Sequence, residues 1–254
     1  MESVAQPLGF LKVISHEVRW HMLTLLAHSD YKVQELVSLL EHPQNLVSYH
    51  LKQLRDIKLV QERRSTADAR DIYYRLDLEQ LKTYYLQIGQ TLHPILVDTS
   101  AHPMAVENET PARILFVCTE NSARSQMAEG ILRHLGGGWV KVTSAGIQPS
   151  RVHPNAIRVL AAMGIDISQQ RSKHLDVFQD HAFDYFITVC DRARETCPAF
   201  PNIANIIHWS LPDPAAVEDH DNAQYQAFED IAQQLFVRTQ HLLTSIAYTK
   251  EVVQ

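Results

Sequence analysis

One cysteine, Cys118, begins a short segment whose residue types fit the binding of a tetrahedral anion. The segment Cys118-Thr119-Glu120-Asn121-Ser122-Ala123-Arg124-Ser125 follows an apolar run and precedes a helical pattern. In such a loop the backbone N–H groups and the N-terminus of the next helix converge on one oxyanion. Arg124 offers a planar guanidinium fork that holds two oxygens. We therefore expect Cys118 to act as a nucleophile on an anion surrounded by Thr119, Glu120, Asn121, Ser122, Ala123 and Ser125.

The surroundings of Cys118 also predict its reactivity. A positive environment stabilises a thiolate, so we expect the loop to lower the pKa of Cys118. Ser125 is placed to donate a hydrogen bond to the sulfur, and Asn121 is placed to brace the loop. Asp213 follows the last strand-like run, where a carboxylic acid can protonate an oxygen that leaves the anion. The spacing Cys-x5-Arg is weak by itself, and its position between a strand and a helix makes it specific.

Two further thiols, Cys190 and Cys197, lie seven positions apart. If the residues between them are helical, their Cα atoms stand about 10 Å apart, at ~1.5 Å per residue. A disulfide requires Cα atoms within about 7 Å of each other. A disulfide between these two cysteines therefore requires the helix to unwind, which is typical of a redox switch rather than of a static crosslink.

Strand and helix patterns alternate after residue 112. Apolar runs predict strands at 113–117, 139–144, 183–189 and 205–209, and helical spacing predicts helices at 125–135, 154–163 and 223–247. The run Gly136-Gly137-Gly138 ends the first of these helices. The alternation predicts an α/β domain with a doubly wound parallel sheet over residues 113–254.

The first half of the chain is mainly α-helical by pattern. Apolar residues recur at helical spacing from 10 to 40, Pro43 marks a turn, and another helix is predicted at 46–54. Two strand-like runs, 59–64 and 71–76, surround a polar turn and predict a hairpin, and a helix follows at 78–90. The proline-containing stretch 93–112 has no sustained period and is typical of a linker. We therefore predict two domains, 1–92 and 113–254.

The composition is that of a globular protein, with 45% hydrophobic and 20% charged residues. No apolar run approaches the ~18 residues that cross a bilayer, so we expect no membrane contact. No signal peptide is evident at the start of the sequence. Three cysteines are too few for a secreted disulfide framework. These features predict a cytoplasmic protein with free thiols.

Residues 113–245 resemble the low-molecular-weight phosphatase-fold arsenate reductases of the thioredoxin-coupled type. The matching motifs are Cys118–Arg124, Ser125–Gly130, Ser144–Gly146, Arg171–Lys173, the pair Cys190 and Cys197, and Trp209–Pro214. The resemblance implies that Cys118 attacks arsenate while Asp213 assists the loss of water. Cys190 then attacks the Cys118–arsenic adduct and releases arsenite, and Cys197 resolves the resulting disulfide. Thioredoxin, or a glutaredoxin system, reduces the final Cys190–Cys197 disulfide.

The sequence departs from this family at two positions of the loop. Glu120 stands where the family usually has Gly, and Ala123 stands where it usually has Cys. We expect Glu120 to weaken oxyanion binding or to raise the pKa of Cys118, and to remove a permissive backbone position. Ala123 removes a thiol that the family's cycle does not require.

Residues 8–90 resemble the winged helix-turn-helix of the ArsR/SmtB family of arsenic- and metal-responsive repressors. The resemblance is carried by residues 15–19, 33–40, 45–54 and 73–76. The second helix of such a motif enters the major groove, which implies that DNA is faced by Gln44, Asn45, Ser48, Tyr49, His50 and Lys52. Residues 50–75 hold seven Lys/Arg against four Asp/Glu. This local excess predicts phosphate contacts, among them from Arg63 and Arg64.

Partners follow from the two resemblances. The stretch Lys32-Val33-Gln34 lacks the Cys-x-Cys pair with which such repressors often bind arsenite, and the nearby histidines lack metal-ligand spacing. We expect no metal and no tightly bound cofactor, and a homodimer formed through the first domain. The expected partners are arsenate (with phosphate and sulfate as mimics), double-stranded DNA, and thioredoxin or glutaredoxin.

Two alternatives remain open. A low-molecular-weight protein-tyrosine phosphatase shares the cysteine loop and the aspartate. Against it, Ala215 and Ala216 stand where those phosphatases commonly have an aromatic pair, and a phosphatase has no need of Cys190 and Cys197. A non-catalytic, arsenic-responsive regulator would use the three thiols to bind arsenite.

Overall fold

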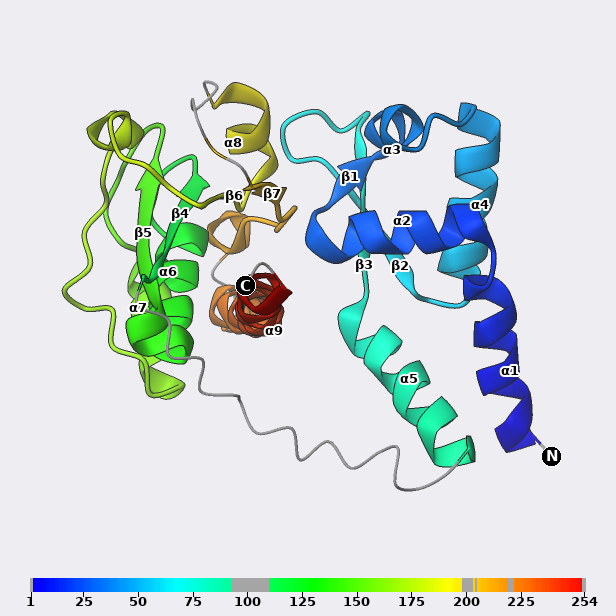
Figure 1. Ribbon diagram of the computed structural model, residues 1–254. Coiled ribbons are helices and arrows are strands. Elements are labelled where there is room, and N and C mark those ends of the chain that lie inside the picture. Colours follow the sequence, from blue (N-terminus) through cyan, green and yellow to red (C-terminus); the bar gives the residue numbers. More distant parts are fainter. Residues whose placement is uncertain (1, 93–109, 198–202, 204, 219–221, 253–254) are drawn as a thin grey trace. The chain divides into compact units, whose positions relative to one another are not determined.

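The chain forms two compact units in the computed structural model, Met1–Ala105 and Val106–Gln254 (Figure 1). The structure describes residues 2–92, 110–197, 203, 205–218 and 222–252. The predicted linker, 93–112, lies outside the described residues except for its last three, and Ala112 is already the first residue of a strand. Each unit has its own core of buried apolar side chains.

The first unit is mainly helical and contains a small antiparallel sheet. Its elements are α1 (Glu2–Ile14), α2 (Glu17–His28), β1 (Tyr31–Lys32), α3 (Val33–Leu40), α4 (Gln44–Asp56), β2 (Val60–Arg64), β3 (Ile72–Leu76) and α5 (Leu78–Leu92). The predicted helix-turn-helix and hairpin are present, and the sheet order is β1-β3-β2. The strand β1 was not predicted, because two residues are too few to show a period.

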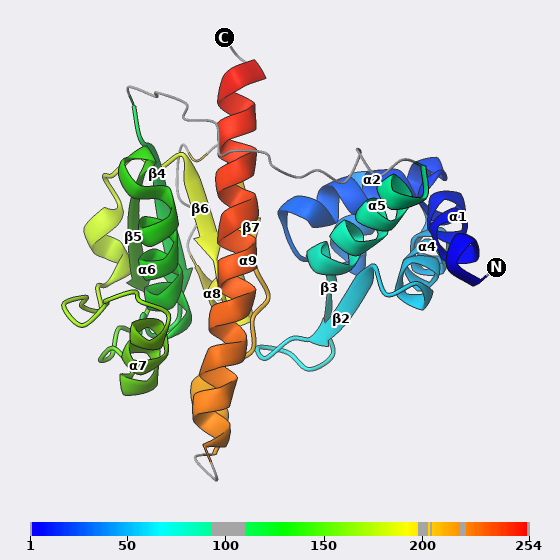
Figure 2. The same ribbon diagram turned by 90° about the horizontal axis from the view of Figure 1, so that it is seen from below.

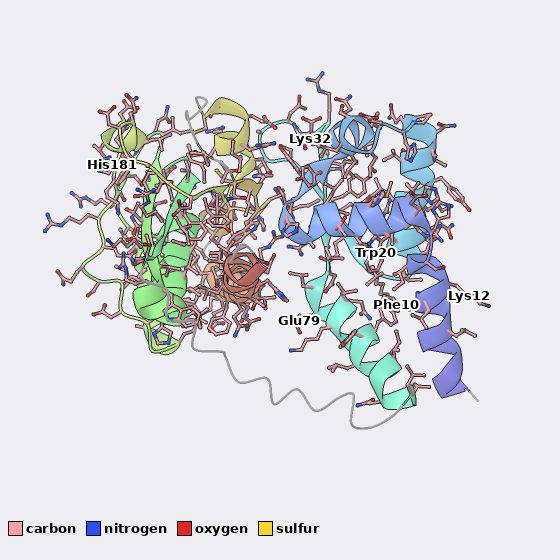
Figure 3. All side chains as sticks on the ribbon, in the orientation of Figure 1. Phe10, Lys12, Trp20, Lys32, Glu79 and His181 are labelled. Atoms are coloured by element: carbon pink, nitrogen blue, oxygen red, sulfur yellow. The ribbon has the colours of Figure 1, made fainter. Side chains whose placement is uncertain are left out.

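Local chemistry explains the turn between α3 and α4. Glu41 adopts the left-handed conformation, with φ 55°, and ends α3. Pro43 precedes α4 directly, where its missing N–H leaves no helical hydrogen bond unmade. At the other end of the unit, α1 packs on α5, and Figure 3 labels Phe10 on α1. The ring of Phe10 stacks on that of Tyr84, with centroids 4.8 Å apart.

The second unit is an α/β domain, as predicted. Its elements are β4 (Ala112–Cys118), α6 (Arg124–Gly136), the 3-10 helix η2 (Gly137–Trp139), β5 (Val140–Gly146), α7 (Pro154–Ala162), η3 (Leu175–Phe178), β6 (Tyr185–Thr188), α8 (Asp191–Thr196), β7 (Asn205–His208), η4 (Pro214–Ala216) and α9 (Ala223–Val252). The four strands are parallel, in the order β5-β4-β6-β7. The helix α6 contacts β4, β5, α7 and α9, α8 contacts β4 and β6, and α9 runs the length of the unit (Figure 2).

The strand β4 is central and buried on both faces, which explains its continuous apolar run. Because the strands are parallel, their carboxyl ends share one edge of the sheet, where ligands bind in open α/β folds. At this edge lie Cys118 as the last residue of β4, Cys190 after β6 and Asp213 after β7.

Within the part of the chain that the structure describes, no helix combines the length and the apolar character required to cross a membrane. Within it, no three His, Cys, Asp or Glu side chains gather closely enough to hold a metal ion.

Candidate functional site

The loop between β4 and α6 is closed by hydrogen bonds to its carbonyl oxygens. Backbone N–H groups that follow β5 donate at 2.8–2.9 Å: Gln148 to Thr119, Ser150 to Glu120 and His153 to Ser122. The carbonyl of Asn121 accepts from Ser172 Oγ at 2.6 Å. In a trans peptide the N–H points away from the carbonyl, so these contacts direct the N–H groups of residues 120–123 into the loop. Converging N–H groups of this kind bind an oxyanion.

Two residues make the loop sterically possible. Asn121 has φ 49°, in the left-handed region that asparagine adopts more readily than most residues. Gly146 pairs with Cys118 in the β4–β5 register. A Cβ atom at Gly146 would lie 2.8 Å from both Asn121 N and Thr119 O. Any side chain at this position would therefore displace the loop.

The sulfur of Cys118 is buried inside the loop. The N–H of Asn121 donates to Sγ at 3.1 Å, and Ser125 Oγ lies 2.9 Å from Sγ. Burial raises the pKa of Cys118 and the neighbouring Cys190 raises it further, whereas Arg124 and these hydrogen bonds lower it. The net direction is upward, so the expected lowering is wrong for this conformation. The loss of water around the sulfur outweighs the positive surroundings.

The side chain of Asn121 ties the loop to neighbouring segments. Its Nδ2 donates to Ser125 Oγ at 2.9 Å and to Ser144 Oγ at 2.8 Å. Its Oδ1 accepts from the backbone N–H of Lys173 at 2.8 Å and from Gln126 Nε2 at 3.0 Å. The structure thus places Asn121 as the expected brace. Its partners occur in motifs that carried the resemblance, but their spacing gave no sign that they meet at one side chain.

Arg124 and Asp213 meet beside the loop. Arg124 Nη2 donates to Asp213 Oδ2 at 2.8 Å, and Arg124 Nη1 donates to the carbonyl of Leu211 at 3.0 Å. The third donor, Nε, is buried without a partner among the described residues. A buried donor that lacks a partner is costly, and an oxyanion held in the loop would supply one. Asp213 Oδ1 accepts from the N–H of Ala215, which fixes the carboxyl at the start of η4.

The two positions that depart from the family lie at different depths. Glu120 is exposed, and its carboxylate accepts from Ser150 Oγ at 3.1 Å and from Ser122 Oγ at 3.5 Å. The left-handed residue of the loop is Asn121, so the expected loss of a permissive position at Glu120 is wrong. Within the described chain, Glu120 is also not among the groups that shift the pKa of Cys118. Ala123 is buried and precedes α6 as its N-cap.

The other two thiols lie at the ends of α8. Cys190 is buried, and its Sγ is 3.4 Å from Thr119 Oγ1 in the Cys118 loop. It caps α8 by accepting from the N–H of Ala193 at 3.4 Å. Cys197 ends α8, with its N–H bonded to the carbonyl of Ala193 at 2.9 Å. All three cysteines are free thiols.

The predicted DNA-facing residues of the first unit divide into two groups. Exposed along α4 are Gln44, Asn45, Ser48, Tyr49 and Lys52. They recur at helical spacing, on the face opposite the buried Val47, Leu51 and Leu54. On β2, Arg63 is half-buried and Arg64 is exposed, and their guanidinium groups donate to nearby carbonyls.

His50 does not lie on this exposed face, so its prediction as a DNA-facing residue is wrong. It is 2% exposed, its ring centroid lies 4.3 Å from that of His16, and Arg19 Nη1 is 3.3 Å from its Nδ1. Burial lowers the pKa of His50, and the nearby His16 and Arg19 lower it further, which favours the neutral ring. The helical period places residue 50 on the inner face of α4, beside Leu51. The prediction that it faces DNA came from the polar character of histidine.

Known proteins are similar to each part of the chain. A family model described as low molecular weight phosphotyrosine protein phosphatase matches residues 113–252, and one described as bacterial regulatory protein, arsR family, matches residues 16–62. An arsenate reductase of Halalkalibacterium halodurans is 40% identical over 123 residues, which are 48% of this chain and 88% of that protein. A glutaredoxin arsenate reductase of Synechocystis sp. is 36% identical over 135 residues, 53% of this chain and 98% of that protein.

A solved structure of an arsenate reductase in the phosphate binding state shares 36% identity with this chain, covers 53% of it and 98% of its own chain, and has a TM-score of 0.47. The phosphatase family model spans more than half of the present chain. The chain therefore belongs to the low molecular weight phosphotyrosine protein phosphatase family, and an arsR-family helix-turn-helix precedes that family's domain.

Proposed function

We propose that the second unit reduces arsenate to arsenite through a relay of three thiols. The observation that carries the proposal is the position of Cys190, whose sulfur is 3.4 Å from Thr119 Oγ1 in the Cys118 loop. Cys190 also raises the pKa of both Cys118 and Cys197, so it lies near both. Ester hydrolysis needs one cysteine, whereas reduction needs a second thiol within reach. Relatives that are arsenate reductases support arsenate as the substrate.

The proposed reaction begins when the Cys118 thiolate attacks arsenic. A sulfur–arsenic bond forms, and one oxygen leaves as water after Asp213 delivers a proton to it. No electrons are transferred in this condensation. Arg124 and the N–H groups of the loop hold the remaining oxygens, where the negative charge develops.

Reduction occurs in the second step. The Cys190 thiolate attacks the sulfur of Cys118, and a Cys118–Cys190 disulfide forms as the sulfur–arsenic bond breaks. The electron pair of that bond stays on arsenic, which leaves as arsenite, so two sulfurs are oxidised for each two-electron reduction. Cys197 then attacks Cys190 and releases the Cys118 thiolate. An external dithiol reduces the Cys190–Cys197 disulfide and restores the starting state.

The relay requires α8 to open, because Cys190 and Cys197 flank this helix. The helix has six residues, of which only Asp191 and Ala193 are buried, and helices this short are unstable by themselves. Burial and the neighbouring Cys190 raise the pKa of Cys197 to about 11. Cys197 therefore stays protonated while α8 is folded, and opening of α8 exposes it to water and makes its thiolate available.

The external dithiol is a protein of the thioredoxin or glutaredoxin type. One relative carries glutaredoxin in its name, which supports the second of these. Cys197 is the sulfur that such a protein reaches, because it is the least buried of the three. The relay suits the cytoplasm, where these reductants keep thiols reduced.

Arsenate turnover in cysteine variants tests the relay. With thioredoxin or glutaredoxin the wild type should turn over repeatedly, and Cys118→Ser should lose activity by ~10³-fold or more. Cys197→Ser should release roughly one arsenite per chain and then stop, because its disulfide is not passed on. Wild-type turnover in Cys190→Ser or Cys197→Ser would contradict the relay.

Aryl phosphate hydrolysis distinguishes the relay from a phosphatase. Hydrolysis needs Cys118, Arg124 and Asp213 but neither later thiol, so any such activity should survive in Cys190→Ser and Cys197→Ser. Efficient aryl phosphate turnover together with no arsenate turnover by any variant would identify the second unit as a phosphatase.

We propose that the first unit binds double-stranded DNA through the exposed face of α4. The match to the arsR-family model and the polar side chains exposed along α4 support this. Asn45→Ala should weaken binding to the specific sequence by about 1–3 kcal/mol, the effect of a lost base contact. Arg64→Ala should weaken binding to every DNA sequence alike and reduce the slope of log affinity against log salt concentration by about 1. Fluorescence anisotropy at several salt concentrations measures both, with the exposed Lys82→Ala on α5 as the matched charge control. An equal loss in Lys82→Ala would contradict the assignment.

We also propose that the first unit forms a homodimer and that the chain regulates transcription in response to arsenic. Sedimentation of the full chain measures the dimer. If regulation operates through the thiols, the oxidised and reduced chains should differ in DNA affinity. A Cys118→Ser chain with unchanged operator binding and an unchanged arsenic response would contradict this coupling.

A further inference from the structure

A buried polar cluster lies directly behind Cys190. Ser210 Oγ donates to Asp191 Oδ1 at 2.7 Å, and His208 Nε2 lies 3.4 Å from the same oxygen. His208 Nδ1 is 2.8 Å from Thr188 Oγ1. All four side chains are buried. None of them belongs to the thiol relay or to the Cys118 loop, so the proposed chemistry leaves this cluster without a role.

The cluster joins two segments that carry reactive groups. Thr188 and Asp191 flank Cys190 along the chain, and His208 and Ser210 precede Asp213. Thr188 and His208 are also partners in the β6–β7 register. A buried carboxylate is costly unless it is paired and hydrogen-bonded. Asp191 is therefore held where Ser210 donates a hydrogen bond to it and His208 Nε2 lies within 3.4 Å, and the adjacent Cys190 is held with it.

The rest of α8 is attached differently. After Asp191 the only buried residue of the helix is Ala193, and Arg192, Glu195 and Thr196 are exposed. The far end is closed by a hydrogen bond of the helix itself, from the N–H of Cys197 to the carbonyl of Ala193. The first turn of α8 is thus fixed by a buried polar cluster, whereas the side chains of Glu195 and Thr196 in its last turn are exposed.

We infer that Asp191 is a positioning residue that, with His208 and Ser210, keeps Cys190 beside Cys118 while α8 opens and Cys197 moves. The contact of Cys190 with Thr119 persists only while the segment on either side of Cys190 stays in place. The inference rests on the proposed relay, because only a relay requires one thiol to remain still while the other travels.

The Cys118–Cys190 crosslink tests this inference without arsenate. In the full chain carrying Cys197→Ser, oxidised glutathione converts the two thiols into a disulfide and releases two molecules of reduced glutathione. Asp191→Ala should slow the formation of this disulfide about tenfold, the equivalent of one lost buried hydrogen bond. Asp191→Asn keeps an oxygen for Ser210 but loses its charge, so it should slow the reaction less. The matched control is Arg192→Ala, at the adjacent exposed position, which should crosslink at the parental rate.

Alkylation of Cys118 by iodoacetamide, followed by mass spectrometry, separates positioning from general damage. The loop that surrounds Cys118 does not involve Asp191, so this rate should not fall in Asp191→Ala. If Asp191→Ala does not fold, Ser210→Ala removes one hydrogen bond from the same carboxylate and should slow the crosslink in the same direction.

Three results would overturn the inference: a parental crosslinking rate in Asp191→Ala (or in Ser210→Ala, where that variant replaces it), an equal slowing in Arg192→Ala, or Cys118 alkylation that slows in step with crosslinking. Failure of the wild type to reduce arsenate is a separate result, read in the arsenate assay, and it leaves the crosslinking outcome unaffected.

Discussion

The segments at the carboxyl ends of the neighbouring strands β4 and β6 both carry cysteines, and they are built in opposite ways. After β4, the carbonyls of residues 119–122 are each bonded to other parts of the unit, and Asn121 ties the loop down from inside. After β6, a six-residue helix is fixed by buried contacts at its first turn and is mostly exposed beyond it. The first arrangement is suited to stabilising charge, and the second is suited to changing shape.

The thiols in the two segments differ in the same way. Burial raises the pKa of both Cys118 and Cys197. The neighbouring Cys190 raises both pKa values further. For Cys118, Arg124 and two hydrogen bonds act in the opposite direction and lower the pKa. The surroundings of Cys118 therefore include groups that favour its thiolate, whereas the two causes at Cys197, burial and the neighbouring Cys190, both raise its pKa. A reaction that joins anion chemistry to disulfide exchange needs one segment of each kind.

Among the tests of this comparison, replacing Arg124 should have the largest effect, because it removes the planar guanidinium group that holds both Leu211 and the anion. Lysine cannot hold Leu211 and the anion together, since it lacks the planar fork. Arg124→Lys should lower kcat/KM for arsenate by about 10²–10³-fold. Steady-state kinetics measure this, with Arg192→Ala on α8 as the control that should match the wild type. Near-normal kinetics in Arg124→Lys would contradict the placement of the anion site in the loop.

Gly146→Ala should have the next largest effect. The added Cβ would contact backbone atoms of Thr119 and Asn121, so the loop must shift. A shift of about 1 Å at a reacting centre costs on the order of 10²-fold in rate. Gly138→Ala is the matched control, because a Cβ there meets nothing within 4 Å. If both glycine variants keep full activity, the loop tolerates displacement, which would contradict the contrast between a rigid loop and a helix, α8, that opens.

The order of elements around the site follows from the sequence, because local patterns determine it. The apolar run of β4, the spacing from Cys118 to Arg124 and the helical pattern of α6 are local signals, and the structure has all three elements in these places. The same holds for the helix-turn-helix, where Pro43 marks the turn. Local periodicity therefore predicted where the segments that hold Cys118 and Arg124 lie.

Interactions between distant segments were not predictable in this way. The brace at Asn121 depends on Ser144 and Lys173, which reach it only through the fold of the sheet. The burial of His50 and the direction of the pKa of Cys118 depend on how much water the packing excludes, which no spacing along the chain reports. Sequence patterns place these side chains on their segments, and packing decides their electrostatic state.

Alkylation across a pH range tests whether the pKa values of Cys118 and Cys197 are raised. Iodoacetamide reacts with the thiolate, which is the scarce form at any pH below the pKa of the thiol. Because both pKa values are raised, both rates should still rise about tenfold per pH unit up to pH ~9, above the ordinary thiol value of about 8.5. A plateau near that ordinary value would contradict the raised pKa values.

A glycine in α8 sharpens this measurement. Arg192 is exposed, so Arg192→Gly and Arg192→Ala differ mainly in helix propensity, by about 1 kcal/mol. Arg192→Gly should raise the alkylation rate of Cys197 about fivefold over Arg192→Ala at neutral pH, because α8 opens more often. The rate at Cys118 should not differ between the two variants. An equal rise at Cys118 would mean that the loop and the helix open together.

The smallest effect is expected at Glu120, although this residue stands in the loop itself. Its carboxylate is exposed and held at the rim by Ser150 and Ser122, so salt screens its repulsion of an anion. Glu120→Gln should lower the KM for arsenate about fivefold at most, the range of exposed charge effects, and the difference should shrink as salt is added. A larger, salt-independent change would mean that the carboxylate turns into the loop when the anion binds. In that case the loop would also change shape during the reaction, and its contrast with α8 would be one of degree.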